Sequence, residues 1–310
     1  MTWREVCEAD LMECLNIEPR HLGDEIVGRE RALAIWKDLI RTRSFNSAVI
    51  ESSTPVATGR IVAFGSSVFV KADFATRELE DPKPGLNSRV VASIASGKSV
   101  VLTEKALCSN NARDALDIVI LGGDYLYGVL STEQVGEAEM MLAFSFMELH
   151  VGYRLNRILL ETTSDAQRRF HESSGVWRIV KSFPSSERAL AVLTREEAFS
   201  ACGSIAAPLF QYQDLVLRLR DTDKHLLSEA VYGETDTELA ARLNLSLSTV
   251  KKRWNSLFAR VAETRSDLLP NADTRENESR GLQKRHRILS YVRAHPQEVR
   301  PYRWRSFKQV

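Results

Sequence analysis

The sequence predicts a multidomain protein: an N-terminal α/β domain, in which helices cover a mixed sheet, followed by a C-terminal all-α helix-turn-helix domain. Three observations favour this class. Residues 1–200 contain short runs rich in Val, Ile and Leu that alternate with helical patterns. Residues 233–261 hold two short helical patterns joined by a turn. The chain of 310 residues also exceeds the length that one hydrophobic core usually serves.

The elements of the N-terminal half follow from residue type and periodicity. Strands are predicted where β-branched and aliphatic residues cluster, over 48–51, 60–70, 100–103, 116–121, 157–162, 177–182 and 190–194. Helices are predicted over 29–41, 86–95, 134–150 and 164–173. Strands that alternate with crossover helices indicate a mixed sheet with helical cover. No glycine-rich phosphate loop of the common nucleotide-binding types occurs.

The first helix of the C-terminal pattern is expected to begin after Thr235, because Glu238 follows at the spacing of a capping box. It should end near Asn244, a residue type that tolerates the left-handed region. Ser246 is then placed to cap the second helix. In that helix an apolar stripe recurs at helical spacing and faces the core, formed by Val250, Trp254, Leu257 and Val261.

From Gly233 the chain reads Gly-x-Thr-x-x-Glu-Leu-Ala-x-Arg-Leu-x-Leu-Ser-x-x-Thr-Val-Lys, which resembles the signature of the LuxR/FixJ-type helix-turn-helix domain. The resemblance covers roughly residues 215–263. It implies that Thr249, Lys251 and Lys252 contact double-stranded DNA and that a following helix mediates dimerisation. The candidate DNA-binding residues are Thr235, Ser246, Ser248, Thr249, Lys251, Lys252, Arg253 and Asn255. A solvated basic face on an ordinary three-helix unit is the alternative.

Charge is divided unevenly along the chain. Residues 211–310 contain 19 Lys and Arg against 13 Asp and Glu, whereas residues 1–210 contain 23 against 28. The basic segment after Gly281 resembles a phosphate-binding extension. An amphipathic helix that packs on the preceding domain is the alternative, because apolar residues recur at Leu282, Ile288, Leu289 and Val292.

These observations divide the chain into a regulatory or sensor domain over residues 1–205, a DNA-binding domain over 206–265, and a linker with a basic tail over 266–310. The N-terminus has acidic residues where a signal peptide needs apolar ones, and no run reaches the roughly 20 apolar residues of a membrane span. We therefore expect a cytoplasmic protein. The four cysteines are scattered, so neither a metal site nor a disulfide framework is expected.

Residues 157–180 resemble the closing strand-helix-strand of the GCN5-related N-acetyltransferase fold. In that family the backbone amides of an Arg/Gln-x-x-Gly-x-Gly/Ala turn at a helix start hold the pyrophosphate of acetyl-CoA. The segment that should hold the pyrophosphate in this chain is residues 122–128, which read Gly-Gly-Asp-Tyr-Leu-Tyr-Gly. That segment lacks the spacing and places Asp124 where an anion would approach.

The function that we predict from the sequence is sequence-specific transcription regulation. The N-terminal sensor domain would control dimerisation or access to DNA, with a small-molecule effector as its signal. The protein would be a homodimer and not an enzyme, without catalytic residues or cofactor. The alternative is an acyltransferase-like N-terminal enzyme tethered to a DNA-binding domain.

Overall fold

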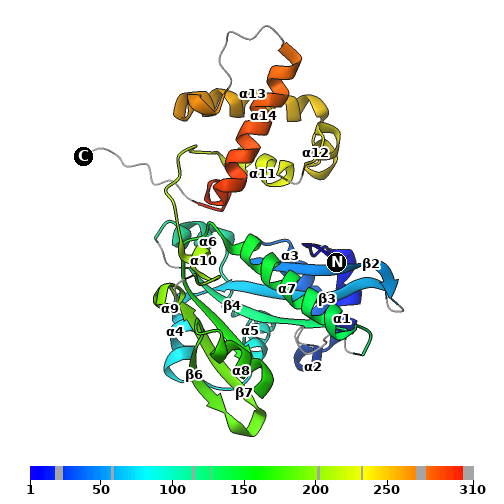
Figure 1. Cartoon of the computed structure of the whole chain (residues 1–310), viewed down its shortest axis with the longest axis vertical. Helices are drawn as coiled ribbons and strands as arrows, with labels where there is room; N and C mark the ends of the chain where they lie inside the picture. The colour runs from blue at the N-terminus through cyan, green and yellow to red at the C-terminus, as the bar shows by residue number, and fades with distance from the viewer. Residues whose placement is uncertain are drawn as a thin grey trace, which may run out of the picture. The chain divides into compact units, whose positions relative to one another are not determined.

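The computed structural model describes residues 1–17, 24–56, 59–113, 116–126, 128–200, 203–231, 233–269 and 277–302. The chain divides into two compact units. An α/β unit comprises Met1–His150, Arg154–Phe210 and, among the described residues, Tyr302. A helical unit comprises Val151–Tyr153 and Gln211–Pro301. Figure 1 shows both units with their helices and strands labelled.

The α/β unit is built on a seven-stranded mixed sheet with the order β1-β2-β3-β4-β5-β7-β6. Neighbouring strands are antiparallel, with the exception of β4 and β5, which are parallel. A parallel pair needs a crossover connection, and α7 supplies it. The strands are β1 (Thr2–Glu5), β2 (Phe45–Val56), β3 (Gly59–Val70), β4 (Leu116–Tyr125), β5 (Leu155–Thr162), β6 (Arg178–Phe183) and β7 (Arg188–Thr194).

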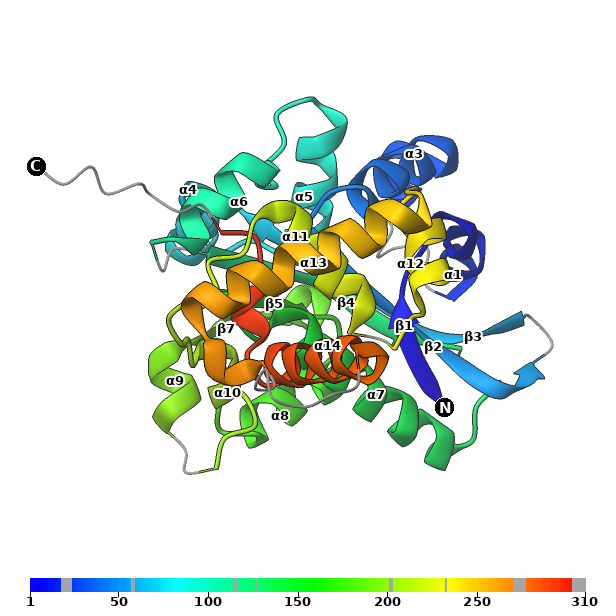
Figure 2. The ribbon, with the colours of Figure 1, turned by 90° about the horizontal axis from the view of Figure 1, so that it is seen from above.

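Helices cover both faces of this sheet (Figure 2). Trp36 of α3 packs edge-on against Phe64, whereas His150 of α7 lies against Phe69, which points to the opposite face of β3. Short 3-10 turns occur at Glu8–Asp10 and Pro184–Ser186. The helices are α1 (Leu11–Ile17), α2 (Asp24–Val27), α3 (Arg29–Ile40), α4 (Ala72–Glu80), α5 (Leu86–Ala95), α6 (Glu104–Asn111), α7 (Thr132–His150), α8 (Asp165–Ser173), α9 (Arg195–Ser200) and α10 (Ala207–Phe210).

The helical unit contains α11 (Asp221–Ala230), α12 (Asp236–Arg242), α13 (Leu247–Thr264) and α14 (Asn277–Ala294), with 3-10 turns at Ser266–Leu268 and Pro296–Glu298. Its core includes the expected stripe of α13 and also three residues of α14, Ile288, Leu289 and Val292. The part of the basic segment that lies in α14 therefore packs as an amphipathic helix, as the second of the two interpretations predicted, and residues 303–310 lie outside the described residues. Leu282 lies outside the residues whose side chains are described.

The predicted fold class needs correction. The fold is that of an α/β unit with a seven-stranded mixed sheet, and the helical unit is not the helix-turn-helix domain of residues 206–265 that was expected. The physical reason is that α14, which lies beyond residue 265, completes the core of the helical unit. Residues 151–153 are also grouped with this unit. The observed boundary falls after Phe210, compared with the expected boundaries at 205 and 265.

Individual elements differ from the expectation in informative ways. Residues 100–103 form no strand and contribute only an isolated bridge between Val70 and Val101. The edge strand β1 and the helices α4 and α6 were not predicted, because each is short. No helix among the described residues is long and apolar enough to cross a membrane.

Candidate functional site

The two central parallel strands stop pairing before they end. β4 pairs with β5 from Leu116 to Ile120, and Ile120 lies opposite Leu160. β4 then continues to Tyr125 and β5 to Thr162, outside this register. An irregularity in β4 lies at the same level, because Ser67 of β3 faces Ile120 while Ser66 faces Gly122, so that Leu121 is an extra residue.

This irregularity requires a glycine at position 122. Its φ is 133°, in the region that side chains disfavour. We name the point where β4 and β5 separate, formed by residues 121–125 of β4 and 161–162 of β5, the strand opening. Irregular strands of this kind are frequent next to active sites, since they redirect backbone groups away from the sheet.

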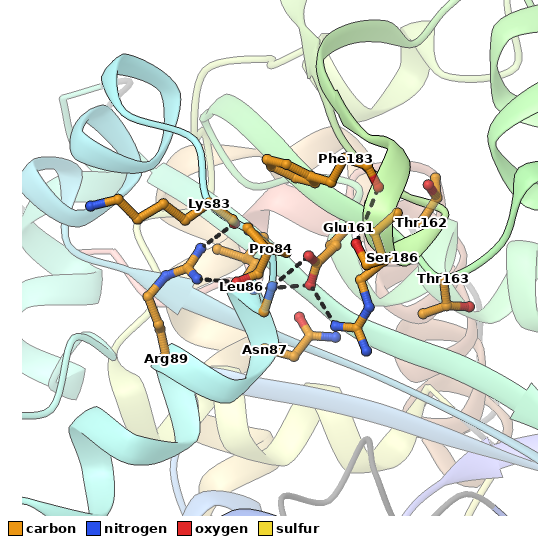
Figure 3. A network of polar contacts seen from close by, with 12 residues as sticks. Lys83, Pro84, Leu86, Asn87, Arg89, Glu161, Thr162, Thr163, Phe183 and Ser186 are labelled. Carbon is orange, nitrogen blue, oxygen red and sulfur yellow. Dashed lines mark hydrogen bonds and ion pairs between the residues drawn. The ribbon is translucent and has the colours of Figure 1, made fainter.

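A buried carboxylate marks the β5 side of the strand opening. Glu161 accepts hydrogen bonds from the backbone amides of Gly85 (2.6 Å) and Leu86 (2.9 Å), the first amides of α5 (Figure 3). Arg188 of β7 lies 3.5 Å from the same carboxylate. The negative charge at the start of a helix is favourable because the free amides and the helix dipole both point toward it.

The β4 side of the strand opening contacts the same helix. The side-chain amide of Asn87, in the first turn of α5, donates to the backbone carbonyl of Leu121. The first turn of α5 thus bridges the two strands where they stop pairing with each other. Two buried polar atoms nearby, Ser66 Oγ and Asn87 Oδ1, have no hydrogen-bond partner among the described residues.

Arg89 stabilises the loop before α5. Its guanidinium pairs with Glu78 of α4. It also donates to the carbonyls of Lys83 and Pro84 (Figure 3). Gly85 is in the left-handed region, with φ of 91°. These contacts hold the first turn of α5 in place from the side opposite to the sheet contacts.

Asp124 is a second buried carboxylate at the strand opening, on β4. It is 6% exposed and lies opposite Phe64 of β3, so its side chain shares a face with that of Ser66 two residues along β3. The amide of Tyr125 donates to it at 2.8 Å. Asp124 and Glu161 therefore place one carboxylate on each of the two separating strands.

The first turn of α7 follows β4 and is capped within itself. The Ser131 amide donates to the Gln134 side chain (2.9 Å), and the Gln134 amide donates to Ser131 Oγ (3.3 Å). Glu137 binds the N-terminal ammonium of Met1 at 2.5 Å. Glu133 is exposed in the same turn. This helix start is therefore acidic, and its reciprocal cap uses an amide that could otherwise bind an anion.

The structure brings together a serine and a histidine that no sequence pattern connects. Ser67 Oγ lies 2.9 Å from His150 Nε2, and the Asn46 side-chain amide lies 3.0 Å from the same nitrogen. His150 Nδ1 lies 2.7 Å from the carbonyl of Phe146, which assigns its proton to Nδ1. Ser67 and His150 are each 1% exposed, so this arrangement joins α7 to β2 and β3.

The residues predicted to contact DNA lie in the helical unit. Thr235 caps α12 in a reciprocal box with Glu238, and Ser246 caps α13 by accepting from the Thr249 amide at 3.2 Å. Asn244 in the turn has φ of 50°, as expected. The exposed side of α13 carries Ser248, Lys251, Lys252 and Asn255, with Thr249 and Arg253 half-buried. That these side chains contact DNA stays a prediction.

No family model matches the sequence, and no curated protein matches it. Solved structures show weak similarity. An agmatine N-acetyltransferase in its apo form is 12% identical, with a TM-score of 0.34, and covers 62% of this chain and 97% of its own. The C-terminal condensation domain of Ebony, in complex with beta-alanyl-dopamine, is 9% identical, with a TM-score of 0.36 and the same two coverages of 62% and 97%. Likenesses this weak do not establish a shared activity.

These findings correct the function predicted from the sequence. The similar structures are an acetyltransferase and a condensation domain, and neither is described as a LuxR-type transcription regulator or a DNA-binding sensor. The expectation that the protein is not an enzyme is corrected on the same ground.

The strand opening differs from the site expected from the sequence for identifiable reasons. Residues 122–125 belong to β4 and do not form the expected pyrophosphate turn. The helix start lies later, and residues 133–138 read Glu-Gln-Val-Gly-Glu-Ala. This run has the Gly-x-Ala spacing of the pyrophosphate turn, but Glu133 occupies the position of its Arg or Gln. The Gly-x-Ala spacing was therefore present in the sequence, but at the start of α7 and not in residues 122–128.

Proposed function

We propose that the α/β unit is an acyltransferase-type enzyme that moves an acyl group from a thioester to a nucleophilic acceptor at the strand opening. The separation of β4 from β5 after Ile120 and Leu160 carries this proposal. An extended arm can add alongside an unpaired strand edge and bind its backbone amides and carbonyls, as peptides do in strand addition. The thioester carbonyl would then lie among Ser66, Asn87 and Asp124.

The chemistry follows from the two carboxylates. In transfer, the lone pair of the acceptor attacks the thioester carbonyl, the carbon–sulfur bond breaks with its electron pair on the departing thiolate, and the acceptor loses one proton. We assign Asp124 as the group that takes this proton, because it is a buried carboxylate on the separating strand. Glu161 is a positioning residue, since both amides at the start of α5 already bind its oxygens.

The residues at the start of α7 do not fit the pyrophosphate of a coenzyme A thioester. The amide of Gln134 is used by Ser131 Oγ, and Glu133 and Glu137 supply negative charge. No step of the proposed transfer therefore uses phosphate binding at this helix. The homodimer and the cytoplasmic location expected from the sequence stay proposals.

A thiol-release assay tests the proposed function. The full chain is incubated with acetyl thioesters and a panel of primary amines and alcohols, and free thiol is measured with a chromogenic disulfide. We expect acceptor-dependent release that Asp124→Asn lowers by about 100-fold in kcat, a typical loss for a general base. Asp73→Asn, an exposed acid on α4, is the matched control. Release at the rate of buffer alone with every thioester would overturn the proposal.

A further inference from the structure

The charge of the segment from β4 to α7 determines which acyl donors the strand opening can take. We propose that the donor is an uncharged thioester, such as an acylated pantetheine-like arm, and not a thioester that carries nucleotide phosphates. This inference names the donor class of the proposed acyl transfer and rests on that function. Four observations lead to it.

The first observation is the sequence of this segment. Residues 116–150 contain no Lys or Arg, and their acidic residues are Asp117, Asp124, Glu133, Glu137, Glu139 and Glu148. Asp117 is neutralised by Arg157 at 2.8 Å, at the opposite end of β4 from the strand opening. The remaining acids lie on β4 beyond the irregularity and along α7. A pyrophosphate at the start of α7 would therefore approach a segment of its own charge.

The second observation is the local geometry of the α7 start. A free helix N-terminus attracts anions through unpaired amides and the helix dipole. Here Ser131 Oγ accepts from the Gln134 amide, and the Gln134 side chain folds back to the Ser131 amide. Two amide donors are thus already satisfied inside the protein. The start of α7 therefore has fewer free amides that could bind a phosphate oxygen.

The third observation concerns Glu133, whose carboxylate opposes phosphate binding at the start of α7. Residues 133–138 place Gly136 and Ala138 at the spacing of a phosphate-binding turn. A Cβ on Gly136 would meet nothing within 4 Å, so the backbone there is open. Glu133, which is exposed, lies three residues before Gly136. A carboxylate at this position repels a phosphate that an amide or guanidinium would bind.

The fourth observation is that the cation at this helix start, the N-terminal ammonium of Met1, already forms an ion pair. The ammonium of Met1 binds Glu137 at 2.5 Å. It offsets Glu137 and leaves Glu133 and Glu139 as exposed acids of the first two turns. The balance at the α7 start therefore stays negative, and a neutral donor arm avoids the repulsion.

Two measurements on the full chain test the donor class. Binding of free coenzyme A is measured by calorimetry, independently of any turnover. Thiol release is compared between acetyl-CoA and the neutral thioester S-acetyl-N-acetylcysteamine, with the acceptor panel described above. The informative variant is Glu133→Gln, which completes the Gln-x-x-Gly-x-Ala spacing. Glu139→Gln removes the same charge from the same helix outside that spacing and is the matched control.

We expect no saturable coenzyme A binding by the unmodified chain at millimolar concentration, and a kcat/KM for the neutral thioester at least equal to that for acetyl-CoA. Glu133→Gln should strengthen coenzyme A binding by about tenfold relative to Glu139→Gln, the effect of removing one close like charge. Micromolar binding of coenzyme A by the unmodified chain would overturn the donor class, whether or not transfer occurs. Absence of both coenzyme A binding and thiol release would leave phosphate exclusion in place and overturn the acyl transfer.

Discussion

The Glu161 carboxylate lies 2.9 Å from the amide nitrogen of Leu86, although 75 residues separate them along the chain. This contact places the end of β5 against the start of α5. Because Asn87, the next residue of α5, reaches the carbonyl of Leu121, one helical turn spans both sides of the strand opening. The arrangement of the candidate site therefore depends on α5, which belongs to the three-helix segment between β3 and β4.

Glu161→Gln is expected to destabilise the α/β unit by about 1–3 kcal/mol. The substitution replaces a buried charged acceptor by an amide, whose NH2 group would face either the Gly85 or the Leu86 amide donor to donor. Urea unfolding measured by the fluorescence of tryptophan, with hydrogen exchange of the α5 amides, checks this. Glu80→Gln, an exposed acid on α4, should change stability by less than about 0.5 kcal/mol. Equal stability of the two variants would refute the proposed role of Glu161.

Two buried serines offer a matched comparison. Ser67 Oγ bonds to His150, whereas Ser44 Oγ is buried without a partner among the described residues. Ser67→Ala should cost about 1 kcal/mol and Ser44→Ala should be neutral or stabilising, since only the first removes a hydrogen bond. The midpoints of urea unfolding measure both. A larger loss for Ser44→Ala would show that the His150 contact does not stabilise the fold.

The thiol of Cys14 should be unreactive in the folded protein. Burial raises the pKa of Cys14 to about 12, and the residue is 0% exposed, while Cys7 is exposed. At pH 8 we expect a chromogenic disulfide to modify Cys7 quickly and Cys14 only after unfolding, as peptide mapping would show. The unfolded thiol ionises near 9.0, its ordinary value, so the stability contributed by the protonated buried thiol is present below pH 9 and lost as the pH rises toward 12. Fast labelling of Cys14 in the native chain would contradict its burial.

Arg285 is expected to stabilise the helical unit through three contacts. It binds Asp236 at 2.7 Å, donates to the Glu234 carbonyl at 2.6 Å, and lies 4.7 Å from the centre of the Trp254 ring. Arg285→Lys should cost about 1–2 kcal/mol, because lysine lacks the planar fork that makes these contacts together. Thermal unfolding of the full chain, followed by the helical circular dichroism signal, is the measurement.

Arg287→Lys is the control for Arg285, because Arg287 is exposed on the same helix. A loss of similar size in both variants would mean that α14 is held by its apolar residues alone.

Local features were predictable because they depend on residues a few positions apart. The capping of α12 by Thr235, the left-handed Asn244, and the buried stripe of α13 from Val250 to Val261 all follow from short-range hydrogen bonds and periodicity. The function assigned from them was wrong, since a local pattern specifies helices and their turn but not the activity of the whole chain.

The candidate site could not be predicted because its contacts connect distant positions. Glu161 and Leu86, Ser67 and His150, and Asn87 and Leu121 are 75, 83 and 34 residues apart. Nothing in the neighbourhood of Glu161 indicates that its carboxylate caps a helix that precedes it by so many residues. Asp124 was noticed in the sequence, but its segment was read as a turn where the structure has a strand.

The sequence by itself determined the secondary-structure elements with strong periodicity, the caps of α12 and α13, and the acidic character of residues 116–150. These depend on residue type and on spacings within a turn or two of helix. Only the tertiary structure decided the strand order, the separation of β4 from β5, and the placement of α5 across that separation. The physical reason is that burial and hydrogen bonding between distant segments select one arrangement among the many that the same local pattern allows.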